Sequence, residues 1–178
     1  MARLEAWFDR LRASWARLRL RACDVVGPGA RVIGAPHVEN RGRIELGRGF
    51  VWSSVPVRSH FVVGPHGVLR IGDDVHIAHG AALSVDAEVT IGDGSVLGPF
   101  VTILDSDYHE VNHREAHGEA RAIHIGRNVR LGAGVVVLRG AIISDGAVIA
   151  PNSTVSRFIP AGARASGVPA RPVASPPR

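Results

Sequence analysis

Residues 125–155 read IGRNVRLGAGVVVLRGAIISDGAVIAPNSTV, and this stretch decides the fold. Large aliphatic side chains occupy every sixth position, namely Ile125, Leu131, Val137, Ile143, Ile149 and Val155. Four residues after successive steps comes a second series of small or β-branched residues: Val129, Val135, Ala141, Ala147 and Ser153. Neither the helical period of about 3.6 residues nor the strand period of 2 generates this spacing. A fixed period of six is typical of a parallel β-helix, in which equivalent side chains of successive coils stack.

The same stretch is a poor helix. A helical interpretation would place three glycines and a proline in one helix interior, where both residue types are destabilising: Gly134, Gly140, Gly146 and Pro151. Glycine suits the corners of a solenoid, because a positive φ is needed there and a Cβ would oppose it. The 21 glycines and the low aromatic content of 5% also fit narrow coils with tight corners. We therefore predict an all-β solenoid.

The six-residue period extends toward the N-terminus with two interruptions. It is regular at Ile71, Ile77 and Leu83, slips by two residues, and resumes at Ile91, Leu97 and Ile103. Strand-like fragments at residues 31–33 and 43–47 have a looser phase, which predicts irregular first coils. We place the solenoid domain at residues 31–173 and expect the proline-rich tail, residues 174–178, to be disordered.

One step of the repeat contains a large insertion. Ile103 and Ile125 are 22 residues apart, which is 16 more than the regular step. The inserted segment, residues 104–122, reads LDSDYHEVNHREAHGEARA and contains three histidines. A long polar loop on a regular scaffold is usually functional or disordered.

Residues 1–23 differ in kind from the repeat. Their apolar side chains are spaced by three and four, which predicts an amphipathic helix with one apolar face: Leu4, Trp7, Phe8, Leu11, Trp15, Leu18 and Ala22. Six arginines supply most of the remaining surface. Such a helix either packs on its own solenoid or a neighbouring subunit, or lies on an anionic membrane surface.

Charge and cysteine content narrow the function classes. The net charge is +5, all of the basic residues are arginine, and Cys23 is the single cysteine. A positive balance favours anionic ligands such as phosphates. Basic residues interleaved with aromatic ones, or zinc-finger spacing, would indicate nucleic acid, and neither is present. A lone cysteine excludes a disulfide framework and CxxC metal sites. With no long apolar run, we expect a cytoplasmic protein.

Three motifs resemble those of a known enzyme family. They are IGRNVRLGAG at residues 125–134, TILDSDYH at 102–109 and ASGVPARPV at 165–173. Together, in this order, they resemble the hexapeptide-repeat acyltransferases with a left-handed parallel β-helix. The sugar O-acetyltransferases of the galactoside and maltose type are the most similar, over about residues 71–173. The resemblance implies a homotrimer that binds acetyl-CoA in a groove between neighbouring subunits.

The resemblance also implies a catalytic base. The catalytic histidine of the family lies in the inserted loop, and the matching residue here is His109. Neutral imidazole titrates near pH 7 and can take the proton of an acceptor hydroxyl. The oxygen then attacks the thioester directly, a backbone N–H stabilises the oxyanion, and no acyl-enzyme forms. Asp105 and Asp107 flank this histidine, and either of them would orient the imidazole or bind the acceptor.

Further site residues are implied by the same match. Asp86 matches a family aspartate that binds the acceptor sugar, and His79 lies one residue out of register from a family asparagine. The positions matching the coenzyme A site are Ala133, Pro151, Ser156, Arg157 and Arg171. Arginine binds phosphate oxygens bidentately, whereas proline has no N–H to donate. Either one cofactor hydrogen bond is missing at Pro151, or a neighbouring residue supplies it. Arg130 replaces the tryptophan usual in the family.

The resemblance predicts an acetyl-CoA-dependent O-acyltransferase. The acceptor is expected to be a hydroxyl of a sugar, in particular of a cell-envelope or exopolysaccharide saccharide, with peripheral contact to the inner membrane face through residues 1–23. Three alternatives remain: a xenobiotic acetyltransferase of the chloramphenicol or streptogramin type, a non-catalytic scaffold, and a metal enzyme similar to γ-carbonic anhydrase. The last would need a converging set of imidazoles. His76 and His79 are close in sequence but lack a third ligand, so we expect no metal.

Overall fold

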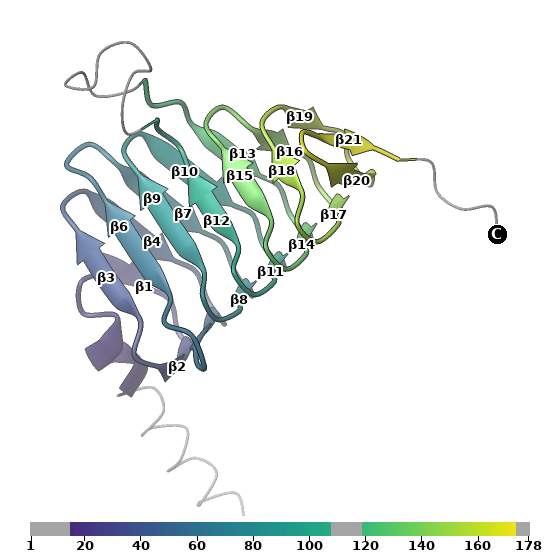
Figure 1. The fold of residues 1–178 in the computed structure, drawn as a ribbon. Coiled ribbons are helices and arrows are strands. Elements are labelled where there is room, and N and C mark those ends of the chain that lie inside the picture. The colour runs from purple at the N-terminus through teal and green to yellow at the C-terminus, as the bar shows by residue number, and fades with distance from the viewer. Residues whose placement is uncertain (1–14, 108–118, 174–178) are drawn as a thin grey trace, which may run out of the picture.

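The computed structural model describes residues 15–107 and 119–173, and in them the chain winds into a solenoid of parallel strands (Figure 1). The strands form three sheets, one along each side of the coils. The first sheet contains β1 (Val25–Val26), β4 (Arg43–Leu46), β7 (Val68–Ile71), β10 (Glu88–Ile91), β13 (Ile123–Ile125), β16 (Ile142–Ile143) and β19 (Phe158–Ile159). The predicted all-β solenoid is confirmed.

The other two sheets complete each coil. The second contains β2 (Arg31–Gly34), β5 (Val51–Ser54), β8 (His76–Ile77), β11 (Val96–Leu97), β14 (Arg130–Leu131), β17 (Val148–Ile149), β20 (Arg164–Gly167) and β21 (Ala170–Pro172). The third contains β3 (His37–Asn40), β6 (His60–Val63), β9 (Ala82–Val85), β12 (Thr102–Leu104), β15 (Val136–Leu138) and β18 (Thr154–Val155). Successive strands of the chain therefore belong to successive sheets.

The six-residue series forms the core. Ile71 pairs with Ile91, Ile91 with Ile125, and Ile125 with Ile143, and each of these side chains is at most 4% exposed. The pairing of Ile91 with Ile125 crosses the insertion, so the extra residues leave the coil without shifting its register. Fixed register is expected here, because a slip of one residue would turn the aliphatic series out to solvent.

The first coils are regular strands despite their loose sequence phase. Trp52 of β5 and Phe61 of β6 stack with their ring centroids 3.8 Å apart, and both side chains are 0% exposed. Large aromatic rings fill this part of the interior, where later coils use aliphatic side chains. The first strand, β1, begins at Val25, ahead of the predicted domain start at residue 31.

The described part of the N-terminal segment packs on the end of the solenoid (Figure 1). Residues 15–19 are helical, and Ala16 and Leu20 are 1% exposed within the core cluster. Trp15 and Leu18 belong to the predicted apolar face, yet they are 47% and 57% exposed. The solenoid therefore buries a different side of this helix. Residues 1–14 and 174–178 lie outside the described part, and no described helix is long and apolar enough to cross a membrane.

Candidate functional site

Most of the predicted site residues that the structure describes lie at two corners, one at each end of the strands of the third sheet. The 2–3 corner, between the second and third sheets, consists of turns centred on His79–Gly80, Pro99–Phe100, Ala133–Gly134 and Pro151–Asn152. The 3–1 corner, between the third and first sheets, contains Asp86–Ala87, the base of the insertion, Arg139–Gly140 and Ser156–Arg157.

Asp105 anchors the 3–1 corner. Its side chain is 0% exposed, and its two carboxylate oxygens accept hydrogen bonds from the N–H groups of Asp86 and Ala87, both at 2.8 Å. Burial raises the pKa of this carboxyl, while the two N–H donors act in the opposite direction. Both oxygens are thus committed to the preceding coil. Asp105 therefore has a structural role, which differs from both roles predicted for an aspartate beside His109.

Asp86 is exposed at the same corner. Its carboxylate accepts a hydrogen bond from the hydroxyl of Ser106, the residue after Asp105. The insertion therefore begins with two contacts to the coil before it. Asp86 remains at the surface beside the insertion, as an acceptor-binding residue would need to be.

The two ends of the insertion are joined by ion pairs. Arg139 of the next coil contacts Asp107 at 2.6 Å and Glu119 at 3.3 Å, and Arg121 contacts Glu119 at 2.8 Å. The Arg121 side chain lowers the pKa of Glu119, first through its hydrogen bond. Residues 106 and 120 also form an antiparallel bridge. Asp107 thus pairs with Arg139. Residues 108–118, including the predicted base His109, lie outside the described part of the chain.

Backbone hydrogen bonds connect the successive turns of the 2–3 corner. The second residue of each turn has a positive φ and donates its N–H to the preceding coil: Gly80 to Val57, Phe100 to His79, Gly134 to Pro99 and Asn152 to Ala133, at 2.8–3.0 Å. Ala133 is exposed, and its own N–H has no backbone acceptor among the described residues.

Pro151 occupies the turn position equivalent to Ala133, but proline has no N–H. The neighbouring N–H groups are already used, because the Ala150 N–H donates to Ala165 and the Asn152 N–H donates to Ala133. Neither backbone N–H beside Pro151 is therefore free, and Pro151 itself has only a carbonyl oxygen to offer as a hydrogen-bonding group.

His79 and Asp86 do not share a pocket within one chain. They lie beyond opposite ends of β9, so His79 belongs to the 2–3 corner and Asp86 to the 3–1 corner. The His79 ring meets the Phe100 ring edge-on, with centroids 5.1 Å apart, and its buried Nδ1 has no partner in the described structure. The family resemblance implied that both residues line one acceptor site, but within one chain the strand β9 separates them.

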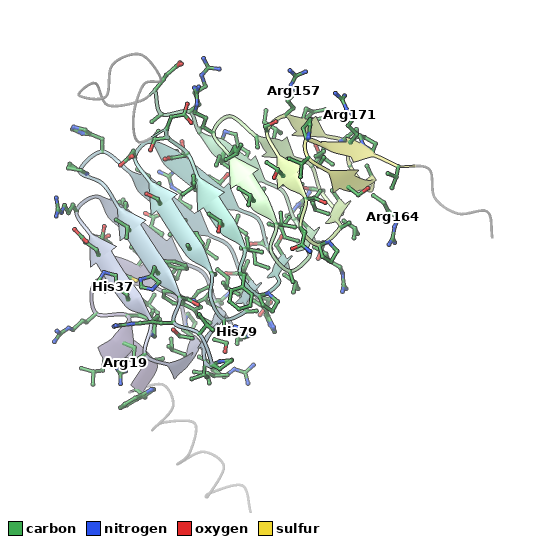
Figure 2. The ribbon with its side chains drawn as sticks, viewed as in Figure 1. Arg19, His37, His79, Arg157, Arg164 and Arg171 are labelled. Atoms are coloured by element: carbon green, nitrogen blue, oxygen red, sulfur yellow. The ribbon has the colours of Figure 1, made fainter. Side chains whose placement is uncertain are left out.

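The predicted cofactor residues are divided in the same way. Ala133 and Pro151 are at the 2–3 corner, whereas Ser156 and Arg157 follow β18 at the 3–1 corner. Arg171 lies in β21, and Figure 2 shows it near Arg157 at the C-terminal end of the solenoid, with Arg164 on another side. One chain therefore does not gather all five residues.

A groove on the second sheet is flanked by two arginines that the sequence did not indicate as ligand-binding residues. It has a volume of about 290 Å³, and its lining includes Gly132, Ala150 and Pro151, with Arg130 and Arg164 among the flanking residues. Arg130 and Arg164 occupy equivalent positions of the repeat, because both are in register with Val148. Neither has a carboxylate partner in the described structure. Their shared position, one residue before a core step, was visible in the sequence.

A larger hollow of about 540 Å³ lies on the first sheet, away from both corners. Its arginine, Arg70, is paired with Glu45 and Glu88. That hollow therefore has no free cation for an anionic ligand. Within residues 15–107 and 119–173, no three histidine, cysteine or carboxylate side chains converge on a metal position.

Comparison with known proteins agrees with this architecture. Residues 122–157 match the family described as bacterial transferase hexapeptide (six repeats). No curated protein sequence matches the chain. Among solved structures, the hexapeptide-repeat acetyltransferase VCA0836 of Vibrio cholerae is 24% identical, with a TM-score of 0.65, over 92% of this chain and 80% of that one. It has also been solved with acetyl-CoA.

Two further structures share the fold. A maltose O-acetyltransferase of Clostridium difficile is 22% identical, with a TM-score of 0.59, over 88% of this chain and 71% of that one. The N-acyltransferase AntD of Bacillus cereus, solved with dTDP and 3-hydroxybutyryl-CoA, is 16% identical, with a TM-score of 0.67, over 88% of this chain and 85% of that one. The predicted hexapeptide repeat and left-handed β-helix are thereby confirmed.

Proposed function

We propose that this protein is an acyl-CoA-dependent O-acyltransferase that transfers an acetyl group from acetyl-CoA to a sugar hydroxyl. The groove on the second sheet is the main support. It combines a lining of small and aliphatic residues, the nearby Ala133 N–H, which has no backbone acceptor among the described residues, and the guanidinium groups of Arg130 and Arg164, which have no carboxylate partner there. Small residues admit a pantetheine arm, and guanidinium groups bind phosphate oxygens.

The remaining cofactor contacts come from the C-terminal end. Arg157 and Arg171 are exposed there, with no carboxylate partner among the described residues (Figure 2). Within one chain these arginines and the 2–3 corner are apart, so one subunit's groove would be completed by arginines of a neighbour. A homotrimer provides that second wall. Ser156 would contribute a hydroxyl to the same end of the ligand.

The proposed reaction is a direct transfer. His109 takes the proton of the acceptor hydroxyl, and the oxygen attacks the thioester carbonyl. The C–S bond breaks, coenzyme A leaves as the thiolate, and the proton returns to sulfur. A backbone N–H beside the thioester carbonyl would stabilise the oxyanion. Asp86 would hold the acceptor, since it remains exposed beside the insertion.

The acceptor is proposed to be a saccharide, because the Clostridium relative in fold is a maltose O-acetyltransferase. Membrane-proximal acceptors of the cell envelope fit the N-terminal segment. Trp15 and Leu18 are exposed, and the Arg19 guanidinium lies 4.4 Å from the Trp15 ring centroid. Aromatic, aliphatic and cationic side chains together suit the interface of an anionic membrane.

Calorimetric titration of acetyl-CoA into the full-length protein, without an acceptor, tests the proposal. Saturable binding is expected, weakened about tenfold or more in Arg164→Ala and kept in His109→Ala. Arg127→Ala is the matched control, because Arg127 pairs with Asp145 away from the groove. Wild-type protein that binds no acetyl-CoA would overturn the proposal. Given binding, turnover with maltose, galactose and chloramphenicol separates sugar acceptors from xenobiotic ones.

A further inference from the structure

One turn of the 2–3 corner contains a residue that does not suit its backbone. The second position of each turn has φ of 70° at Gly80, 68° at Gly134 and 58° at Asn152, and φ of 60° at Phe100. Glycine and asparagine tolerate this left-handed region, whereas a bulky side chain there is strained. Among the described residues with positive φ, Phe100 is the one aromatic. Retained strain of this kind is a reason to look for a role.

The Phe100 ring lies along the corner toward the preceding coil. A Cβ added at Gly80 would be 2.6 Å from Phe100 Cδ1, so the ring covers Gly80 directly. Its edge-on partner is His79, and the Phe100 side chain is still 49% exposed. The next two turns have Gly134 and Asn152 at this position. Asn152 covers Gly134 with a short amide, since a Cβ added at Gly134 would lie 2.4 Å from Asn152 Oδ1. The turn that contains Phe100 therefore has the largest side chain of these four turns.

The Phe100 ring lies at one end of the proposed coenzyme A track. The inference rests on the proposed function, in which the pantetheine arm passes Pro151 and Ala133 and the phosphates lie toward the C-terminal coils. The thioester end then points to the preceding turn of the same corner, which is Pro99–Phe100. The acyl group would meet the Phe100 ring.

We propose that Phe100 is the end-stop of the acyl pocket and restricts the donor to short acyl groups such as acetyl. The ring fills the space above Gly80, which has no side chain of its own. Replacing the ring by asparagine would leave an amide over Gly80, as Asn152 does over Gly134, and would open the space beside His79 to a longer acyl group. Each methylene that a pocket accepts or rejects changes discrimination by about 10- to 200-fold.

The test compares acetyl-CoA, butyryl-CoA and hexanoyl-CoA as calorimetric ligands of the full-length protein. Wild type is expected to bind acetyl-CoA at least about tenfold more tightly than butyryl-CoA. In Phe100→Asn this ratio should fall close to one, with acetyl-CoA affinity nearly unchanged. Asn152 shows that asparagine fits the same turn position. The variant should therefore fold, with a Tm at least equal to that of wild type.

Phe158→Asn is the matched control, because Phe158 is another exposed phenylalanine, 60% exposed, on the first sheet. It should retain the wild-type ratio. Equal weakening of all three ligands in Phe100→Asn would make the ring a general contact surface and overturn the inference, as would an unchanged ratio. Wild-type protein that binds no acyl-CoA would overturn the proposed function and this inference with it. If wild type binds acetyl-CoA but Phe100→Asn keeps the wild-type affinity ratio, only this inference is overturned and the proposed function stands.

Discussion

The 2–3 corner and the 3–1 corner border the same sheet, yet different groups hold them together. At the 2–3 corner each turn is tied to the previous coil by a backbone hydrogen bond, and most side chains there are small. At the 3–1 corner the insertion interrupts the turns, and side chains add to the backbone hydrogen bonds, namely the Asp105 carboxylate and the ion pairs of Arg139. Short turns closed by backbone alone leave no room for extra residues, whereas side-chain contacts fasten the two ends of an added loop.

The largest expected effect comes from adding a side chain where coils touch at the 2–3 corner. A Cβ at Gly132 would lie 2.6 Å from the Pro151 nitrogen, so backbone would have to move. Gly132→Ala should lower the free energy of unfolding by about 3 kcal/mol, as overpacking does. Gly162→Ala is the control, since nothing lies within 4 Å and only its φ of 65° opposes a side chain. That variant should lose about 1 kcal/mol, and equal losses in urea titrations would contradict the prediction.

A smaller loss is expected at the 3–1 corner when its anchor is removed. Asp105→Ala leaves the N–H groups of Asp86 and Ala87 without their acceptors. The free energy of unfolding should fall by about 2 kcal/mol, the cost of buried unsatisfied donors. Asp105→Asn keeps one carbonyl oxygen and should lose less. If both variants unfold at the wild-type urea concentration, side chains do not hold this corner.

The same carboxyl predicts a pH dependence. Because burial raises the pKa of Asp105, the folded state binds its proton more tightly than the unfolded state does. Its contribution to stability should therefore fall as the pH rises from the unfolded pKa, about 3.9, through the folded pKa, and stay constant above it. Urea titrations of wild type and Asp105→Asn across this pH range measure the difference. A difference that grows in favour of wild type with rising pH would show the opposite sign.

The smallest effect is expected from the ion pairs at the base of the insertion. Arg139→Gln removes the contacts to Asp107 and Glu119, whose side chains are 53% and 61% exposed. Solvent and salt screen such pairs, so the Tm should fall only slightly at low ionic strength and not at all at high ionic strength. Arg48→Gln, which removes the pair with Asp73 elsewhere on the surface, is the control for loss of an exposed ion pair.

The regular coils were predictable because stacking requires the same residue at each step. Ile91 and Ile125 pair across the insertion, as expected for residues three steps of the repeat apart once the 16 extra residues leave the coil. The first coils hid their regularity, because Trp52 and Phe61 fill the interior in place of an aliphatic series. No local pattern indicates that two distant aromatic rings will stack.

The candidate site was predictable in part. The division of His79 from Asp86 by β9 follows from the coil register, which their separation in sequence does not reveal. The commitment of Asp105 to the N–H groups of Asp86 and Ala87 also depends on which residues the next corner brings near. Phe100 could have been found, since it occupies the position held by Gly134 and Asn152, three residues after a core step.

The two ends of the solenoid have a further consequence. A stack of parallel strands exposes unpaired edges at each end, and such edges invite another chain to add its own strands. At the last coil, β21 runs antiparallel to β20 and ends in Pro172, which has no N–H to offer. At the first coil, the Asn40 side chain of β3 binds Ala22 and Asp24, and the Ile44 N–H of β4 donates to Asp24, so the segment after the helix is tied across the end of the solenoid. Both features oppose the addition of strands from another chain, at β20 and at the first coil.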